Sequence, residues 1–67
     1  MIHLIINGKT VELDKPTLLS KFLESMGINL QFVAVAHNGT ILDRSKFEST
    51  LLNQGDEVEI VRPVGGG

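Results

Sequence analysis

The sequence predicts a small α+β domain in which a mixed β-sheet packs on one helix. Two Asn-Gly pairs, at residues 7–8 and 38–39, each separate two apolar stretches, which is typical of β-hairpins. Between the hairpins, apolar residues recur at helical spacing over residues 17–26. One helix offers one apolar stripe and one sheet offers one apolar face. We therefore expect the two to pack together as a two-layer domain.

The first hairpin is expected to join strands at residues 2–6 and 9–13. A type I′ turn needs positive φ at both central residues, which Asn-Gly supplies, and its two-residue length fixes the strand register. The pairs that then share one face are Ile6 with Lys9, Leu4 with Val11, and Ile2 with Leu13. Five of these six side chains are apolar, so this face is expected to form the core. The opposite face carries His3, Ile5, Thr10 and Glu12.

The helix is expected to open at Pro16 and Thr17, with the Thr17 hydroxyl as its N-cap. Its apolar stripe, assigned to the core, is Leu18, Leu19, Phe22, Leu23 and Met26. Gly27 is expected to end the helix in a left-handed conformation, and Ile28 to fold back over the last turn.

Three further strands are expected, at residues 33–37, 40–42 and 57–61. Phe47 is the one apolar residue of the segment 43–49 and is expected to anchor that segment to the core. Pro63 cannot donate to a sheet ladder and marks the end of the last strand. The helical crossover permits the first and last strands to pair in parallel.

Composition excludes several functional classes. The 67 residues suffice for one domain, and the net charge of -2, with scattered Lys and Arg, disfavours nucleic-acid binding. There is no cysteine, hence no disulfide framework and no thiolate metal site. No stretch approaches the ~20 apolar residues of a membrane span, so a soluble cytoplasmic protein is expected. No metal is expected; His3 and His37 are interpreted as solvated strand residues, and Asp56, Glu57 and Glu59 as parts of a turn and a solvated face.

The last glycines have no expected structural role, whereas the four earlier glycines fall at turns and at the helix end. We expect a folded body at residues 1–61 and a flexible C-terminal tail at residues 62–67. A frayed terminus is the simplest alternative. However, a thread without side chains, formed by Gly65, Gly66 and Gly67, fits a narrow channel into another protein's active site. The α-carboxylate of Gly67 is then the candidate reactive group, and no catalytic residue is expected in the chain.

A partner that takes this tail should also contact the adjoining surface. Ile5 and Val61 are expected on the sheet face away from the helix, side by side if the first and last strands are neighbours. The apolar residues that would extend this patch are Ile41, Ala34 and Ala36. The residues expected to contact a partner are Ile5, Val61, Arg62, Pro63 and Val64. Acidic residues near the tail are further candidates for meeting a basic partner.

The whole chain resembles the ThiS family of ubiquitin-like β-grasp sulfur carriers of thiamin biosynthesis. The stretches that carry the resemblance are IINGKTVEL at residues 5–13, TLLSKFLESMGI at 17–28, VAVAHNGTIL at 33–42, LLNQGDEVEIV at 51–61 and RPVGGG at 62–67. Each stretch is weakly specific alone. Their order, the total length and the final glycines are together fairly specific.

The resemblance implies a carrier that acts as a co-substrate of enzymes and is not itself an enzyme. A ThiF-like adenylating enzyme would use ATP to convert the carboxylate of Gly67 into an acyl-adenylate, and a sulfur donor protein would replace AMP to leave a thiocarboxylate. A ThiG-like thiazole synthase would receive the sulfur. Gly65 and Gly66 match the thread that enters the partner, and no cofactor is bound by the chain. Two alternatives stay open: the small subunit of molybdopterin synthase, with the same chemistry, and a ubiquitin-like modifier or binding module.

Overall fold

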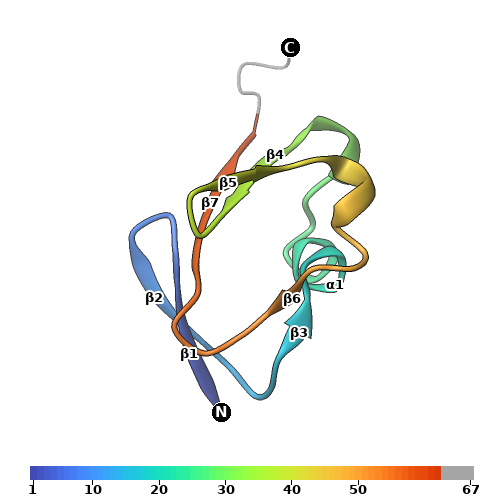
Figure 1. Cartoon of the computed structure of the whole chain (residues 1–67). Helices are drawn as coiled ribbons and strands as arrows, with labels where there is room; N and C mark the ends of the chain where they lie inside the picture. The colour runs from blue at the N-terminus through green and yellow to red at the C-terminus, as the bar shows by residue number, and fades with distance from the viewer. Residues whose placement is uncertain (63–67) are drawn as a thin grey trace.

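The computed structural model describes residues 1–62. The expectations for Pro63, Val64, Gly65, Gly66 and Gly67 lie outside the described residues. Within residues 1–62, five strands form one mixed sheet, and the helix α1 (Leu19–Ser25) packs on one face of it (Figure 1). In spatial order the strands are β2 (Lys9–Leu13), β1 (Ile2–Ile6), β7 (Glu57–Val61), β4 (Ala34–His37) and β5 (Thr40–Leu42). The predicted two-layer α+β architecture is confirmed.

The first hairpin has the predicted register, with Ile2 opposite Leu13 and Ile6 opposite Lys9. Its turn residues Asn7 and Gly8 have φ of 51° and 81°, as a type I′ turn requires. The predicted parallel pairing of β1 with β7 is also confirmed. The core face of β1 is buried at every second residue, because the period of a strand is two.

Asn7 fastens this turn to the last strand. Its Oδ1 accepts a hydrogen bond of 2.7 Å from the backbone amide of Ile60, and its Nδ2 donates to the Ile60 carbonyl over 3.1 Å. The side chain thus continues the β1–β7 ladder where the backbone of β1 turns away. This contact positions the end of β7, from which the predicted tail begins.

The predicted start of the helix is too early, since the N-cap is Leu18 and not Thr17. Thr17 and Leu18 form a short strand, β3 (Thr17–Leu18), that pairs antiparallel with β6 (Leu51–Leu52). Thr17 is not an N-cap, because its hydroxyl donates to the carbonyl of Lys15 over 2.8 Å. Proline and threonine before an apolar run fit a helix start from sequence, but the long-range pairing with β6 decides the local structure.

Backbone carbonyls take the place of the expected side-chain cap. The first amides of α1, on Leu19 and Ser20, donate to the carbonyls of Thr50 and Phe47 over 2.8 and 3.0 Å. An orphan amide at a helix start needs some acceptor, and here the segment before β6 supplies it. Phe47, only 2% exposed, follows the 3₁₀ turn η2 (Arg44–Lys46) and anchors this segment in the core, as predicted.

The apolar stripe of α1 is narrower than predicted. Leu19, Phe22 and Leu23 are buried, whereas Leu18 and Met26, which we assigned to the core, are exposed. The helix end is as predicted, because Gly27 has a φ of 74° and the amide of Ile28 donates back to the carbonyl of Leu23 over 3.1 Å. The remaining core residues come mainly from the sheet: Ile2, Leu4, Ile6, Val35, Val58 and Ile60, with Ile28 and Leu52.

The connector between α1 and β4 contains a second 3₁₀ turn, η1 (Leu30–Phe32). Asn29 caps it, since its Oδ1 accepts a hydrogen bond of 2.9 Å from the amide of Gln31. Strand β4 then begins at Ala34, one residue later than predicted. None of the helices in residues 1–62 has the length and apolar character needed to cross a bilayer.

Candidate functional site

The described chain ends at Arg62, directly after β7 and at the end of the molecule opposite Met1 (Figure 1). Val61 is held in the sheet by pairing with Ala34 of β4. One residue earlier, Ile60 is held by Asn7. The point from which the predicted tail departs is therefore fixed on both sides, by β4 and by the β1–β2 turn.

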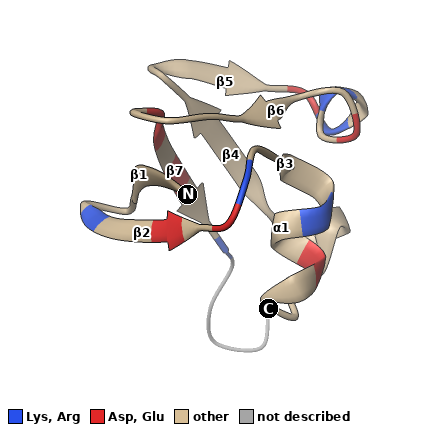
Figure 2. Ribbon diagram, turned by 90° about the horizontal axis from the view of Figure 1, so that it is seen from below, with Lys and Arg blue, Asp and Glu red and all other residues tan. Residues whose placement is uncertain are grey.

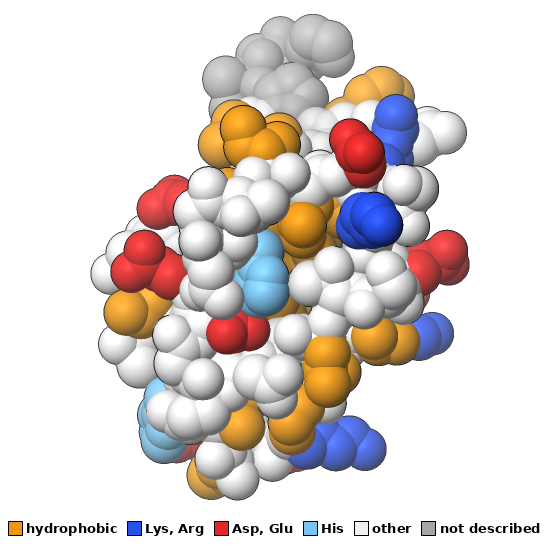
Figure 3. Space-filling model, in the orientation of Figure 1, with side chains coloured by type: hydrophobic (Ala, Val, Ile, Leu, Met, Phe, Trp, Pro, Cys, Tyr) orange, Lys and Arg blue, Asp and Glu red, His pale blue; other side chains and the backbone are white. Residues whose placement is uncertain are grey.

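Next to this point, the sheet face away from the helix carries an apolar surface that we call the outer patch, formed by Ala34, Ala36, Ile41 and Val61. Ala34 pairs with Val61 and Ala36 with Ile41, so strand pairing brings all four together. Ile41 is 81% exposed and Val61 is 64% exposed. Together with Val35 and Glu59, the patch lines a shallow hollow of about 170 Å³. In Figure 3, hydrophobic side chains gather directly beside the grey residues.

Ile5 does not lie beside Val61, contrary to our expectation. It pairs with Glu57 at the start of β7, and Val61 lies four residues further along that strand, about 13 Å away at the rise of a β-strand. Ile5 instead lines a separate hollow of about 230 Å³ with His3, Leu4, Thr10 and Gly55. The parallel pairing of β1 with β7 was predicted correctly. Its register was not, because no short turn joins these two strands and fixes how they align.

Acidic side chains border the outer patch. Glu57 and Glu59 are exposed on the same side of β7 as Val61, and Figure 2 shows acidic positions on this strand and a basic one before the grey trace. Glu12, opposite His3 on the first hairpin, lies 2.8 Å from its ring nitrogen. Within residues 1–62, the positions of the five-stranded sheet that face away from the helix carry no Lys or Arg; the exposed Lys9 of β2 lies on the other face, opposite Ile6. This face therefore suits a partner surface with positive charge.

Asp56 lies directly before β7, at the end of that strand opposite Arg62, and its carboxylate links the neighbouring turns. Its Oδ2 lies 2.9 Å from His37 Nε2 and accepts a 2.8 Å hydrogen bond from the Asn53 amide, while its Oδ1 accepts from Asn38 Nδ2 over 3.2 Å. Burial opposes ionisation of this carboxyl, but the hydrogen bonds outweigh it and lower the pKa of Asp56. His37, interpreted from sequence as solvated, is partly buried against Asp56. These hydrogen bonds hold the β4–β5 hairpin in place, so we interpret the cluster as part of the structure and not as a functional site.

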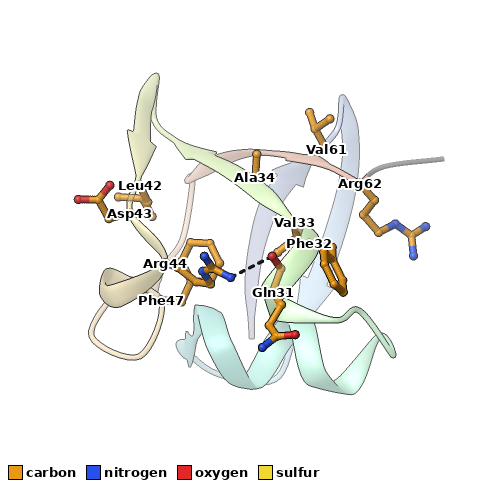
Figure 4. Close-up of a pocket in the computed structure, with 10 residues that line it drawn as sticks. All are labelled: Gln31, Phe32, Val33, Ala34, Leu42, Asp43, Arg44, Phe47, Val61 and Arg62. Carbon is orange, nitrogen blue, oxygen red and sulfur yellow. Dashed lines mark hydrogen bonds between the residues drawn. The ribbon is translucent and has the colours of Figure 1, made fainter. Parts of the chain in front are cut away.

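On the other side of the tail's origin lies an open groove of about 500 Å³, which we call the tail-base groove (Figure 4). Its walls come from η1 with the start of β4, from the end of β5 with η2, and from the end of β7. The residues that line it are Gln31, Phe32, Val33, Ala34, Leu42, Asp43, Arg44, Phe47, Val61 and Arg62. Ala34 and Val61 also line the hollow of the outer patch, so the two surfaces are continuous around the tail's origin.

Residues 1–62 contain no group of three or more His, Cys, Asp or Glu side chains placed to hold a metal ion. The features that converge on the end of β7 are an apolar patch, carboxylates and a groove with two arginines. These are the features of a docking surface.

A family model described as "ThiS family" matches residues 4–67, nearly the whole chain. The chain belongs to the ThiS family. Among solved structures, the crystal structure of the thiamine biosynthesis protein (ThiS) from Geobacter metallireducens is 30% identical with a TM-score of 0.84, and the alignment covers 98% of this chain and 100% of that one. The ubiquitin-like β-grasp fold expected from the sequence is confirmed by this match.

Relatives of this ThiS-family chain differ in length. It is 38% identical to the uncharacterized protein ycf40 of Pyropia yezoensis over 66 residues, which cover 98% of this chain and 93% of that one. It is 33% identical over 66 residues to a thiazole synthase of Paramagnetospirillum magneticum, but spans only 20% of that protein. A ThiS-like sequence thus also occurs in a chain about five times as long that is named thiazole synthase.

Of the predicted partner-contacting residues, the structure places Val61 and Arg62 at the tail's origin and Ile5 elsewhere on the face. Pro63 and Val64 lie outside the described residues. Sequence reasoning missed Phe32 and Arg44, which line the tail-base groove. The one available signal was an aromatic residue in a polar connector, since Phe32 is 60% exposed and does not serve the core.

Proposed function

We propose that this chain is a sulfur-carrier protein of thiamin biosynthesis whose working group is the α-carboxylate of Gly67. A ThiF-like adenylating partner joins this carboxylate to the AMP portion of ATP and releases pyrophosphate. A sulfide ion released by a sulfur donor protein then attacks the carbonyl carbon, the bond to AMP breaks and AMP leaves, which gives a thiocarboxylate. A ThiG-like thiazole synthase takes up that sulfur.

The observation that carries this proposal is the family match over residues 4–67, because it includes both the folded body and the final glycines. The related structure from Geobacter metallireducens is named as a thiamine biosynthesis protein. The similarity to chains named thiazole synthase supports that enzyme as a partner. These comparisons favour thiamin biosynthesis over molybdopterin synthesis.

Elementary chemistry explains why a partner enzyme must activate the terminal carboxylate. A carboxylate is a poor electrophile, since its charge repels nucleophiles and oxide is a poor leaving group. Adenylation supplies a good leaving group, as acyl transfer requires. The chain has no cysteine, and with sulfur held on the terminal carbonyl carbon it needs none. In this proposal the chain is a co-substrate that binds no cofactor, and ATP belongs to the adenylating partner.

Partners are proposed to grip the base of the tail through Val61, Arg62, Pro63 and Val64, with Ile5 as a more distant contact on the same face. The outer patch contributes apolar area, and Glu57 and Glu59 contribute charge. A substitution of Ile41, which is largely exposed, by Ser should weaken docking of the adenylating partner and leave the melting temperature unchanged. Leu51→Ser, at an exposed leucine of β6, is the matched control and should alter neither.

The direct test incubates the purified chain with an adenylating partner, ATP and a sulfur donor, and measures its intact mass. The proposal expects a species in which one oxygen is replaced by sulfur. Deletion of Gly66 and Gly67 should abolish this species and leave the melting curve nearly unaltered. An unchanged mass of the full chain under conditions where the partner is active contradicts the proposal. A covalent conjugate between Gly67 and a lysine would instead identify a modifier.

A further inference from the structure

The tail-base groove combines an apolar floor with two cationic side chains. Val33 and Leu42 are half-buried, and Phe47 is fully buried beneath them. Arg44 and Arg62 stand at the rim with a single carboxylate, Asp43. Figure 4 shows Arg44 reaching across the groove from the β5 side, while Arg62 lies beside the start of the grey trace. The groove therefore has a net positive character.

Arg44 is held in place by a hydrogen bond to a neutral group, and its charge is not neutralised by that contact. Its Nη1 donates a 2.9 Å hydrogen bond to the carbonyl of Gln31, a neutral acceptor. Among residues 1–62, neither Arg44 nor Arg62 is in an ion pair with a carboxylate. A guanidinium carries five donors in a rigid fork that matches a carboxylate. Because Gln31 already orders this side chain, less rotamer freedom is lost when a carboxylate binds.

The charge of the groove is opposite to that of the adjoining outer patch. Glu57 and Glu59 lie on the sheet face, and Arg44 and Arg62 lie in the groove, with the end of β7 between them. A protein that surrounds the base of the tail meets both surfaces at once, because Ala34 and Val61 line both. A partner with a basic surface toward the outer patch and an acidic surface toward the groove could then bind in one orientation only, because the reversed orientation would bring like charges together.

We propose that the tail-base groove binds an acidic segment of the adenylating partner, with an apolar side chain over Val33 and Leu42 and a carboxylate on Arg44. The exposed ring of Phe32 forms one wall of this contact. In the proposed function, the adenylating partner is the protein that acts on the chain before it carries sulfur, so it is the partner to which we assign this contact. This inference rests on the proposed function and adds a second, electrostatic contact to the apolar one.

The test measures the affinity of the adenylating partner, without ATP, for the full-length chain and for its Arg44→Gln variant. Loss of a charged partner at a close ion pair should weaken binding by roughly tenfold or more. Arg44→Lys should recover only part of the affinity, since an ammonium cannot make the two-pronged contact. Lys46→Gln removes a charge from the same turn η2 but not from the groove, and should bind like the wild type.

Two results would overturn the inference. One is an Arg44→Gln affinity equal to that of the wild type. The other is an equal loss in Arg44→Gln and Lys46→Gln, which would reveal a general effect of net charge. The melting temperature of Arg44→Gln should match that of the wild type. Partial recovery of the affinity in Arg44→Lys would show that the loss in Arg44→Gln comes from a missing contact and not from unfolding.

The same proteins separate this inference from the proposed function. If the wild type acquires sulfur and Arg44→Gln binds equally well, the groove inference alone fails. If the wild type binds the partner but never acquires sulfur, the carrier proposal fails. The alternative that the groove holds a segment of the chain itself, residues 63–67, is tested by removing that segment. This deletion should leave the NMR signals of Phe32 and Arg44 unchanged in the free protein, and large shifts would overturn the proposal.

Discussion

Replacement of Asp56 by Asn is expected to loosen the hairpin that supports the outer patch. The carboxylate of Asp56 holds His37, Asn38 and the amide of Asn53, at distances of 2.8 to 3.2 Å. Only 15% of its side chain is exposed, so solvent does not replace these partners freely. Asn keeps the size of the side chain but has one acceptor oxygen in place of two and carries no charge.

The expected loss follows from the hydrogen bonds involved. A hydrogen bond to a charged group contributes about 1.5–3 kcal/mol, and Asn retains part of the network, so the variant should lose about 1–2 kcal/mol of unfolding free energy. In a domain of this size that corresponds to a melting temperature lower by about 5–15 °C.

The pH dependence of this loss has a definite sign. The folded-state pKa of Asp56 is lowered, the net result of burial, which raises it, and stronger hydrogen bonds, which lower it. Its stabilisation is therefore present above the unfolded-state pKa of about 3.9 and is lost as the pH falls through the folded-state pKa. The difference between wild type and Asp56→Asn should be present at neutral pH and shrink as the pH falls below the unfolded-state pKa of about 3.9.

Urea unfolding of both proteins over this pH range measures the difference, with the exposed Asp14→Asn as control. Asp14→Asn should track the wild type at neutral pH. Equal stability of Asp56→Asn and wild type near neutral pH, or a difference that does not change with pH, would refute this reasoning.

Three further substitutions test other parts of the structure by thermal or urea unfolding. Phe47→Ala should lower the unfolding free energy by about 3–5 kcal/mol, because it removes a buried aromatic ring; a loss below about 1 kcal/mol would mean that Phe47 does not anchor the segment before β6. Asn7→Ala should lose about 2–3 kcal/mol, since it strains a residue with φ of 51° and breaks both hydrogen bonds to Ile60; Asn7→Gly, which removes only the bonds, should lose less. Thr17→Ala should change stability by less than about 0.5 kcal/mol, because Thr17 caps no helix; a loss of about 1 kcal/mol would restore the capping role.

The local signals of the sequence predicted most of the sheet. Asn7-Gly8 fixed a hairpin register that the structure confirms, since an Asn-Gly turn leaves the flanking strands one way to pair. Gly27 predicted the helix end for a similar reason, because few other residues adopt a left-handed conformation there. Phe47 was recognised as an anchor because it is the one apolar residue in its segment.

The errors arose where distant segments decide the outcome. Thr17 looked like an N-cap, but its backbone pairs with Leu52, which is 35 residues away in the sequence. Ile5 and Val61 were placed together because parallel pairing was predicted without its register, and no turn fixes the register of a parallel pair. The tail-base groove could not be foreseen, since Phe32 and Arg44 line one groove only because the fold brings η2 to η1, where Arg44 donates to the carbonyl of Gln31.

The central claim, that the terminal carboxylate of Gly67 is the working group, is tested most directly by a carrier with one extra residue after Gly67. This variant keeps the fold and the docking surface but moves the carboxylate to a different residue. The measurement is thiazole formation by the complete set of partners, with the mass of the C-terminal peptide recorded in parallel. We expect no thiazole and no sulfur on the extended peptide, whereas the unextended chain supports both. Thiazole formation by a carrier that still bears the extra residue would contradict the claim.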